Sequence, residues 1–79
     1  MGLFRRGDSD AARLTAKADK WSREARDEAG KAAAARKTLA SGASSDPGAD
    51  RAAVRRHEEN QRIAAANARD FRDMARRRR

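Results

Sequence analysis

Residues 41–48 read Ser-Gly-Ala-Ser-Ser-Asp-Pro-Gly, and this short stretch decides how the chain is organised. Gly42 suits the left-handed residue that follows a helix, because glycine has no Cβ to clash in that conformation. Asp46 suits the N-cap of a following helix, and Pro47 suits its first position, where the missing amide proton costs no hydrogen bond. The stretch therefore predicts that one helix ends and another begins within about five residues.

Strong helix formers lie on both sides of this turn. Between Asp10 and Ala40 there is no proline and a single glycine, Gly30, and alanine, arginine, lysine and glutamate all favour helices. Asp8 and Ser9, with Asp10, offer N-cap oxygens and negative charge at the start of the first helix. The sequence predicts a flexible basic N-terminus at 1–8, helices at 9–41 and 47–75, a turn at 42–46 and a basic tail at 76–79. So short a connection joins antiparallel neighbours, so the expected fold is all-α, an antiparallel two-helix hairpin.

A seven-residue repeat of the coiled-coil kind supports this pairing. In the first helix, two sets of positions alternate in steps of three and four, and eight of the nine residues are apolar. They are Ala11, Ala18, Ala25, Ala32 and Leu39 in one set, and Leu14, Trp21, Glu28 and Ala35 in the other. The second helix supplies Val54, Gln61, Ala68 and Ala75, and Asp50, His57, Ala64 and Phe71. We call these seventeen positions the seam.

A reversal at residues 43 and 44 fixes which seam positions face one another. The numbers of facing residues then sum to about 85 or 86, so large side chains fall opposite small ones. The predicted pairs are Leu14 with Phe71, Trp21 with Ala64, Glu28 with His57, and Ala32 with Val54.

The seam contains little apolar volume, so a lone hairpin is expected to be marginally stable. The helices hold seven large apolar side chains, namely Leu14, Trp21, Leu39, Val54, Ile63, Phe71 and Met74. Ile63, Asn67 and Met74 share one side of the second helix, as a second stripe beside the seam that contains Val54. We expect a homodimer packed as a four-helix bundle, or a hairpin completed by another protein. The expected interface residues are Trp21, Ile63, Phe71 and Met74.

The composition argues against an enzyme. Seventy-nine residues make one domain at most, 41% of them are charged, and only seven are Leu, Ile, Val or Phe. There is no cysteine, so the chain has no disulfide, thiolate zinc site or cysteine nucleophile. His57 with Glu28 could act as a base or a pH switch. An isolated pair of residues without further ligands, however, is more typical of a structural hydrogen bond. We expect no catalytic residue, no metal site and no cofactor.

The positive charge gathers at the two ends of the sequence. Of the net charge of +8, Arg76–Arg79 supply four and Arg5 and Arg6 supply two, whereas residues 7–75 hold fourteen basic and twelve acidic side chains. An antiparallel hairpin brings both ends together, so we expect one basic pole. Guanidinium groups bind phosphate without base selectivity, so the pole is a candidate non-specific nucleic-acid site. A solubilising tail, or attraction to an acidic protein or membrane surface, is the alternative. The candidate residues are Arg5, Arg6, Arg69, Arg72, Arg76, Arg77, Arg78 and Arg79.

Two further features have open interpretations. Trp21 is either a core residue of the seam, an interface anchor, or a platform on which a base stacks. Residues 1–6, Met-Gly-Leu-Phe-Arg-Arg, are either a flexible start or a segment that makes weak peripheral contact with an anionic membrane. No apolar run approaches the roughly 20 residues that span a bilayer, and no secretory hydrophobic region follows residue 6. We expect a cytoplasmic protein, with any membrane or septum association made through partners.

Short, Ala- and Arg-rich, Lys-poor chains of this kind are typical of high-GC actinobacteria. The chain resembles the small soluble spread (Spd) proteins of Streptomyces conjugative plasmids in length, hydrophilicity and basic helical character, although its opening Met-Gly-Leu-Phe-Arg-Arg and closing arginine run are not signatures of that family. The resemblance implies an accessory protein that assembles with other spread proteins and a septal DNA translocase during plasmid passage between mycelial compartments. It is compositional and assigns no residue a role.

Two functions therefore stay open. The first is a non-enzymatic helical-hairpin interaction or adaptor protein, an accessory of conjugative plasmid transfer and spreading, whose basic pole contacts DNA or an anionic assembly. The alternative is a small non-specific DNA-binding protein or regulator of phage or nucleoid type. The expected partners are a second copy of the chain, other transfer proteins and nucleic acid.

Overall fold

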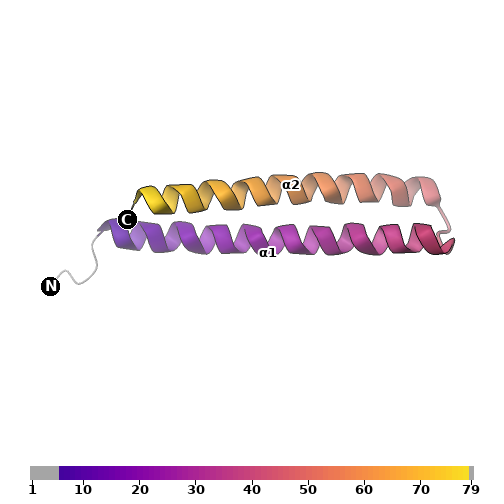
Figure 1. Ribbon diagram of the computed structural model, residues 1–79, viewed down its shortest axis with the longest axis horizontal. Coiled ribbons are helices and arrows are strands. Elements are labelled where there is room, and N and C mark those ends of the chain that lie inside the picture. The colour runs from indigo at the N-terminus through magenta and orange to yellow at the C-terminus, as the bar shows by residue number, and fades with distance from the viewer. Residues whose placement is uncertain (1–5, 79) are drawn as a thin grey trace.

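Two long helices make up the computed structural model, which describes the backbone of residues 6–78 and the side chains of residues 9–78. Helix α1 spans Arg6–Ser41 and helix α2 spans Pro47–Arg77. They run antiparallel and side by side along their length (Figure 1), in a rod of 63 × 16 × 13 Å. The all-α helical hairpin predicted from the sequence is confirmed.

The reversal between the helices uses the residues that punctuate the sequence. Gly42 has φ +74°, and its amide donates to the carbonyl of Leu39 at 3.2 Å, which closes the end of α1. The side chain of Asp46 accepts a hydrogen bond from the amide of Ala49 at 3.1 Å, and Pro47 is the first residue of α2. The glycine stop and the aspartate N-cap are therefore both confirmed.

Helix α1 begins earlier than the sequence predicts. The flexible segment expected over 1–8 is wrong for its last three residues, because the helix starts at Arg6; residues 1–5 lie outside the described part of the chain. The physical reason lies in the first turns, where acidic side chains favour a helix N-terminus. The carboxylate of Asp10 also lies 3.6 Å from Arg13 of the same helix and 3.6 Å from Arg78, so this end of α1 is joined to the end of α2.

Helix α2 ends later than expected. The tail predicted over 76–79 is wrong for its first two residues, since the helix continues to Arg77. Arginine is a strong helix former, and the side chains of Arg76 and Asp73 pair one turn apart. Arg76 and Arg77 are consequently held on the helix and not on a loose extension.

Every predicted seam position is buried or part-buried, but the fully covered residues are small. The buried apolar side chains are Ala11, Ala18, Ala32, Ala64, Ala68 and Ala75, each no more than 3% exposed. Among the described residues, no large side chain is fully buried. The part-buried large ones are Leu14, Trp21, Leu39, Val54 and Phe71. Two helices can enclose a methyl group between them but cover a large side chain from two sides only, so the bulky residues lie at the margins of the seam.

Candidate functional site

The centre of the hairpin holds one buried charged side chain. Glu28 is 6% exposed, and its Oε2 lies 2.5 Å from Nδ1 of His57 across the seam. Nζ of Lys31 lies 3.8 Å from the other carboxylate oxygen. The predicted pairing of Glu28 with His57, and with it the register of the two helices, is confirmed.

The surroundings of Glu28 favour its charged form. The hydrogen bond with His57 is the main cause of a pKa below the ordinary value, burial opposes it, and Lys31 and the side-chain amide of Asn60 add to the lowering. Within residues 9–78, no group of three His, Asp or Glu side chains lies close enough to hold a metal ion. The pair is a satisfied polar contact inside the seam.

One broad side of the hairpin carries two large apolar side chains that are exposed, Ile63 and Met74. Together with Trp21, Asn60 and Asn67 on the same side, they form what we call the apolar face. Ile63 is 50% exposed and Met74 is 38% exposed. Their spacing of four and seven residues through Asn67 keeps them on one side of α2. Trp21 of α1 joins them there, because it lines the same surface hollow as Asn60 and Ile63. Three of the four predicted interface residues are therefore brought together on one surface.

Phe71, the fourth predicted interface residue, is part-buried at the seam. Nζ of Lys17 lies over its ring, 5.7 Å from the centroid, in a cation–π contact between the helices. The ring of Phe71 is therefore already engaged in a contact within the hairpin.

The predicted basic pole is only partly described. The hairpin does bring the beginning of α1 and the end of α2 to the same end of the rod (Figure 1). There, Arg78 lies 3.6 Å from Asp10, and Arg76 pairs with Asp73, so carboxylates offset two of the three described arginines. The predicted pole residues that lie outside the description are Arg5, Arg79 and the side chain of Arg6. The pole in the described residues is weaker than the sequence suggests.

The opposite broad side of the hairpin contains a basic surface that the sequence analysis missed. Contacts between the helices identify this side: Nη2 of Arg72 lies 2.6 Å from Oγ of Ser22, and Arg36 pairs with Glu58. On α2, arginines lie in the row of residues seven apart that contains Arg72, and in the adjacent row farther from α1. Two more arginines of this side lie on α1. We call this surface the arginine face; it comprises Arg26, Arg36, Arg51, Arg55, Arg62, Arg69, Arg72 and Arg76.

This surface could have been found from the sequence by its spacing. Arg55, Arg62, Arg69 and Arg76 recur every seven residues, and residues seven apart share one side of a helix. Because charge was counted along the chain and not around the helix, Arg69, Arg72 and Arg76 were assigned to the pole, and the other five arginines of this face were not singled out.

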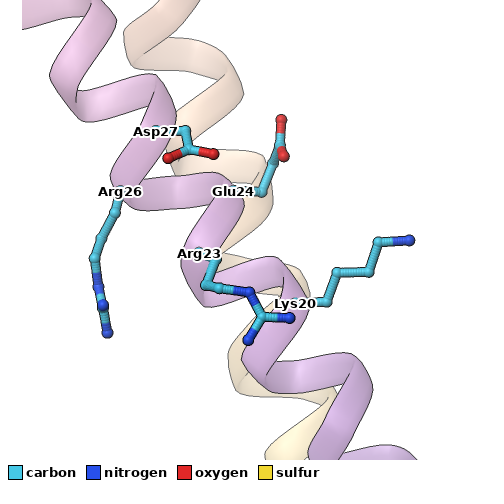
Figure 2. A pocket seen from close by; sticks show the side chains of 5 residues that line it. All are labelled: Lys20, Arg23, Glu24, Arg26 and Asp27. Atoms are coloured by element: carbon cyan, nitrogen blue, oxygen red, sulfur yellow. The ribbon is translucent and has the colours of Figure 1, made fainter.

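The charged outer surface of α1 has a different character. Figure 2 shows five side chains that spread outward from α1, with cations and anions interleaved; they are Lys20, Arg23, Glu24, Arg26 and Asp27. All five residues are exposed. Their mixed signs are typical of a solvated helix surface. Of the five, only Arg26 also belongs to the arginine face, which it borders.

In the part of the chain that is described, neither helix is long and apolar enough to cross a membrane. Comparison with protein families, curated proteins and solved structures finds no match to this chain.

Proposed function

We propose that this protein is a non-enzymatic helical-hairpin interaction protein that associates through its apolar face. The observation that carries the proposal is the exposure of two large apolar side chains on one side of a hairpin whose buried core is mostly alanine. Ile63 lines a surface hollow with Trp21, and Met74 lies about three turns further along α2. Exposed apolar patches are typical of association surfaces. Aromatic and methionine side chains are also enriched in such surfaces.

A second copy of the chain is the proposed occupant of this face. Two helices side by side form a flat layer, and two layers packed face to face make a four-helix bundle. A two-fold axis presents the same surface from both copies, so Ile63 and Met74 would be covered twice by one contact. Such a bundle supplies the apolar burial that six alanines do not.

The basic groups supply the adaptor part of the proposal. Arg76, Arg77 and Arg78 are exposed at the end of the rod where the helices meet the chain ends. We propose that this pole contacts DNA or an anionic assembly while the apolar face holds the second copy. The resemblance to spread proteins supports the proposal that this adaptor is an accessory of conjugative plasmid transfer.

Sedimentation equilibrium tests the association. The wild-type chain is expected to sediment at twice its mass of 8.7 kDa. Replacing Ile63 and Met74 by Gln removes apolar surface with little change in helix propensity, so this variant is expected to shift towards the monomer. Ala52→Gln, at an exposed position on α2, is the matched control and should behave as the wild type. A folded wild-type monomer would contradict the proposal.

A small non-specific DNA-binding protein is the second candidate, favoured by the number of arginines on α2. Removal of residues 76–79 distinguishes the two. Under the second candidate, DNA contact is the function itself, and the removal should abolish DNA affinity. Under the first, association through the apolar face should survive the removal.

A further inference from the structure

We infer that the arginine face binds the phosphate backbone of double-stranded nucleic acid along the side of the rod. The inference rests on the polyanion contact of the proposed function, but it places that contact on the body of the hairpin instead of its end. It also states the form of the polyanion, a duplex read by its charge and not by its sequence.

The arginine face carries a strong excess of one charge. It has eight arginines, and the same rows of residues contain only two carboxylates, Asp19 and Glu58. Arg72 lies 3.7 Å from Asp19, and Arg36 pairs with Glu58. Glu59 and Asp73, from the row beyond, pair with two more of the arginines, Arg62 and Arg76. Even with all four carboxylates counted, the face keeps a net positive charge.

Four arginines on this face are available without breaking an ion pair. They are exposed and pair with no described carboxylate, and they are Arg26, Arg51, Arg55 and Arg69. The pairs made by Arg62 and Arg76 are themselves exposed, with arginine side chains 70% and 71% accessible. Exposed pairs of this kind are worth little, so a phosphate can replace the carboxylate.

The length of the row suits a duplex. Seven residues of helix advance about 10.5 Å, so the row from Arg55 to Arg76 extends about 31 Å. One turn of B-form DNA is about 34 Å, so the row covers nearly a full turn wherever it is laid. A contact of that length meets both phosphate strands, which gives several phosphate contacts for any base sequence.

The remaining side chains of this face argue against other anions. Proteins hold single strands by stacking the bases on aromatic rings. Trp21 and Phe71 make their contacts on the opposite side of the hairpin, so the arginine face offers no such ring. Membrane-surface helices insert apolar side chains, and Ile63 and Met74 also lie on that opposite side. Between the arginines lie small residues, among them Ala65, which let a phosphate backbone approach closely.

The apolar and arginine faces are opposite sides of one layer of two helices. Packing two copies through their apolar faces leaves both arginine faces directed outward. Each dimer therefore offers two separate surfaces to nucleic acid, and the association and the binding do not compete.

Fluorescence anisotropy with a fluorescein-labelled duplex of about 20 base pairs, roughly twice the length of the row, tests the inference across a series of salt concentrations. The row variant replaces Arg55, Arg62 and Arg69 by Gln. Each lost phosphate contact lowers the slope of log affinity against log salt by roughly 0.9, so the expected loss is roughly 2.7. Replacing the same three by Lys keeps the charge and is expected to keep the slope, which separates charge from folding.

A matched control removes the same charge from elsewhere, by Gln at Arg13, Lys20 and Arg56, all exposed and away from the arginine face. Its slope should stay near that of the wild type; an equal fall would overturn the inference, because general attraction would explain it. If removal of 76–79 abolishes duplex binding while the row variant binds normally, the pole is the site and the arginine face is not. Tighter binding of the matching single strand, or of phosphatidylglycerol vesicles, would also overturn it. A wild-type chain that dimerises but binds no duplex would leave only the association proposal standing.

Discussion

Two glycines of the hairpin should respond in opposite ways to the same added methyl group. Gly30 lies on the exposed surface in the middle of α1, and a Cβ built there meets nothing within 4 Å. Glycine inside a helix is about 0.8–1 kcal/mol less favourable than alanine, because glycine loses more conformational freedom on folding. Gly30→Ala is therefore expected to raise the free energy of unfolding by about 1 kcal/mol. For a chain of this size, that corresponds to a rise in midpoint of about 4–8 °C.

Gly42→Ala is the matched change at the turn. A Cβ there also meets nothing within 4 Å, but the backbone has φ +74°. In this left-handed region an alanine side chain crowds its own carbonyl, at a cost of about 1–2 kcal/mol. The free energy of unfolding should fall by about 1 kcal/mol, so the two variants should differ in midpoint in opposite directions from the wild type.

Thermal unfolding followed by far-ultraviolet circular dichroism measures both variants. Protein concentration must be equal throughout, because association makes the midpoint depend on concentration. An unchanged or lowered midpoint for Gly30→Ala would refute the continuous, uncovered helix at residue 30. A raised midpoint for Gly42→Ala would refute the left-handed turn, and with it the place at which the chain reverses.

Three further predictions concern the core, the cap and the buried carboxylate. Ala18 is 0% exposed between the helices, so Ala18→Leu should lower the free energy of unfolding in urea by about 1–3 kcal/mol through overpacking, whereas Ala16→Leu on the exposed surface should not. Asp46→Ala removes the cap of α2 and should cost about 1 kcal/mol in the same assay; no loss would mean that the cap is dispensable. Because the pKa of Glu28 is lowered in the folded chain, its stabilising effect is present above its ordinary value of 4.5 and is lost as the pH falls through the folded pKa. An acid titration of the unfolding midpoint should therefore be flatter in Glu28→Gln, and identical curves would show that the bond with His57 does not contribute.

The fold could be predicted because its signals are local. Gly42, Asp46 and Pro47 mark the ends of two helices through backbone geometry that depends on single residues. A fixed turn then determines which residues face one another, so the contact between Glu28 and His57 followed from counting. The helix ends were less predictable, because arginine and aspartate support both a frayed end and one more helical turn.

The packing and the surface were harder to predict. Large side chains such as Trp21 and Phe71 were expected to fill the seam, but two helices cannot surround them, and alanine occupies the covered positions. The arginine face was missed because charge was summed along the chain. That residues such as Arg55 and Arg69 share one side becomes evident only when the helix is considered as a three-dimensional surface.

The buried Glu28–His57 pair has a consequence for how the two helices can slide. Alanine positions repeat so regularly that a shift of one heptad would still bring methyl groups together in much of the seam. Such a slip would carry the carboxylate of Glu28 either to Ala64, which offers it no hydrogen bond, or to Asp50, which repels it. One polar contact thus makes the alignments shifted by a heptad unfavourable. The alanine seam, which alone would tolerate several alignments of the two helices, is thereby restricted to one.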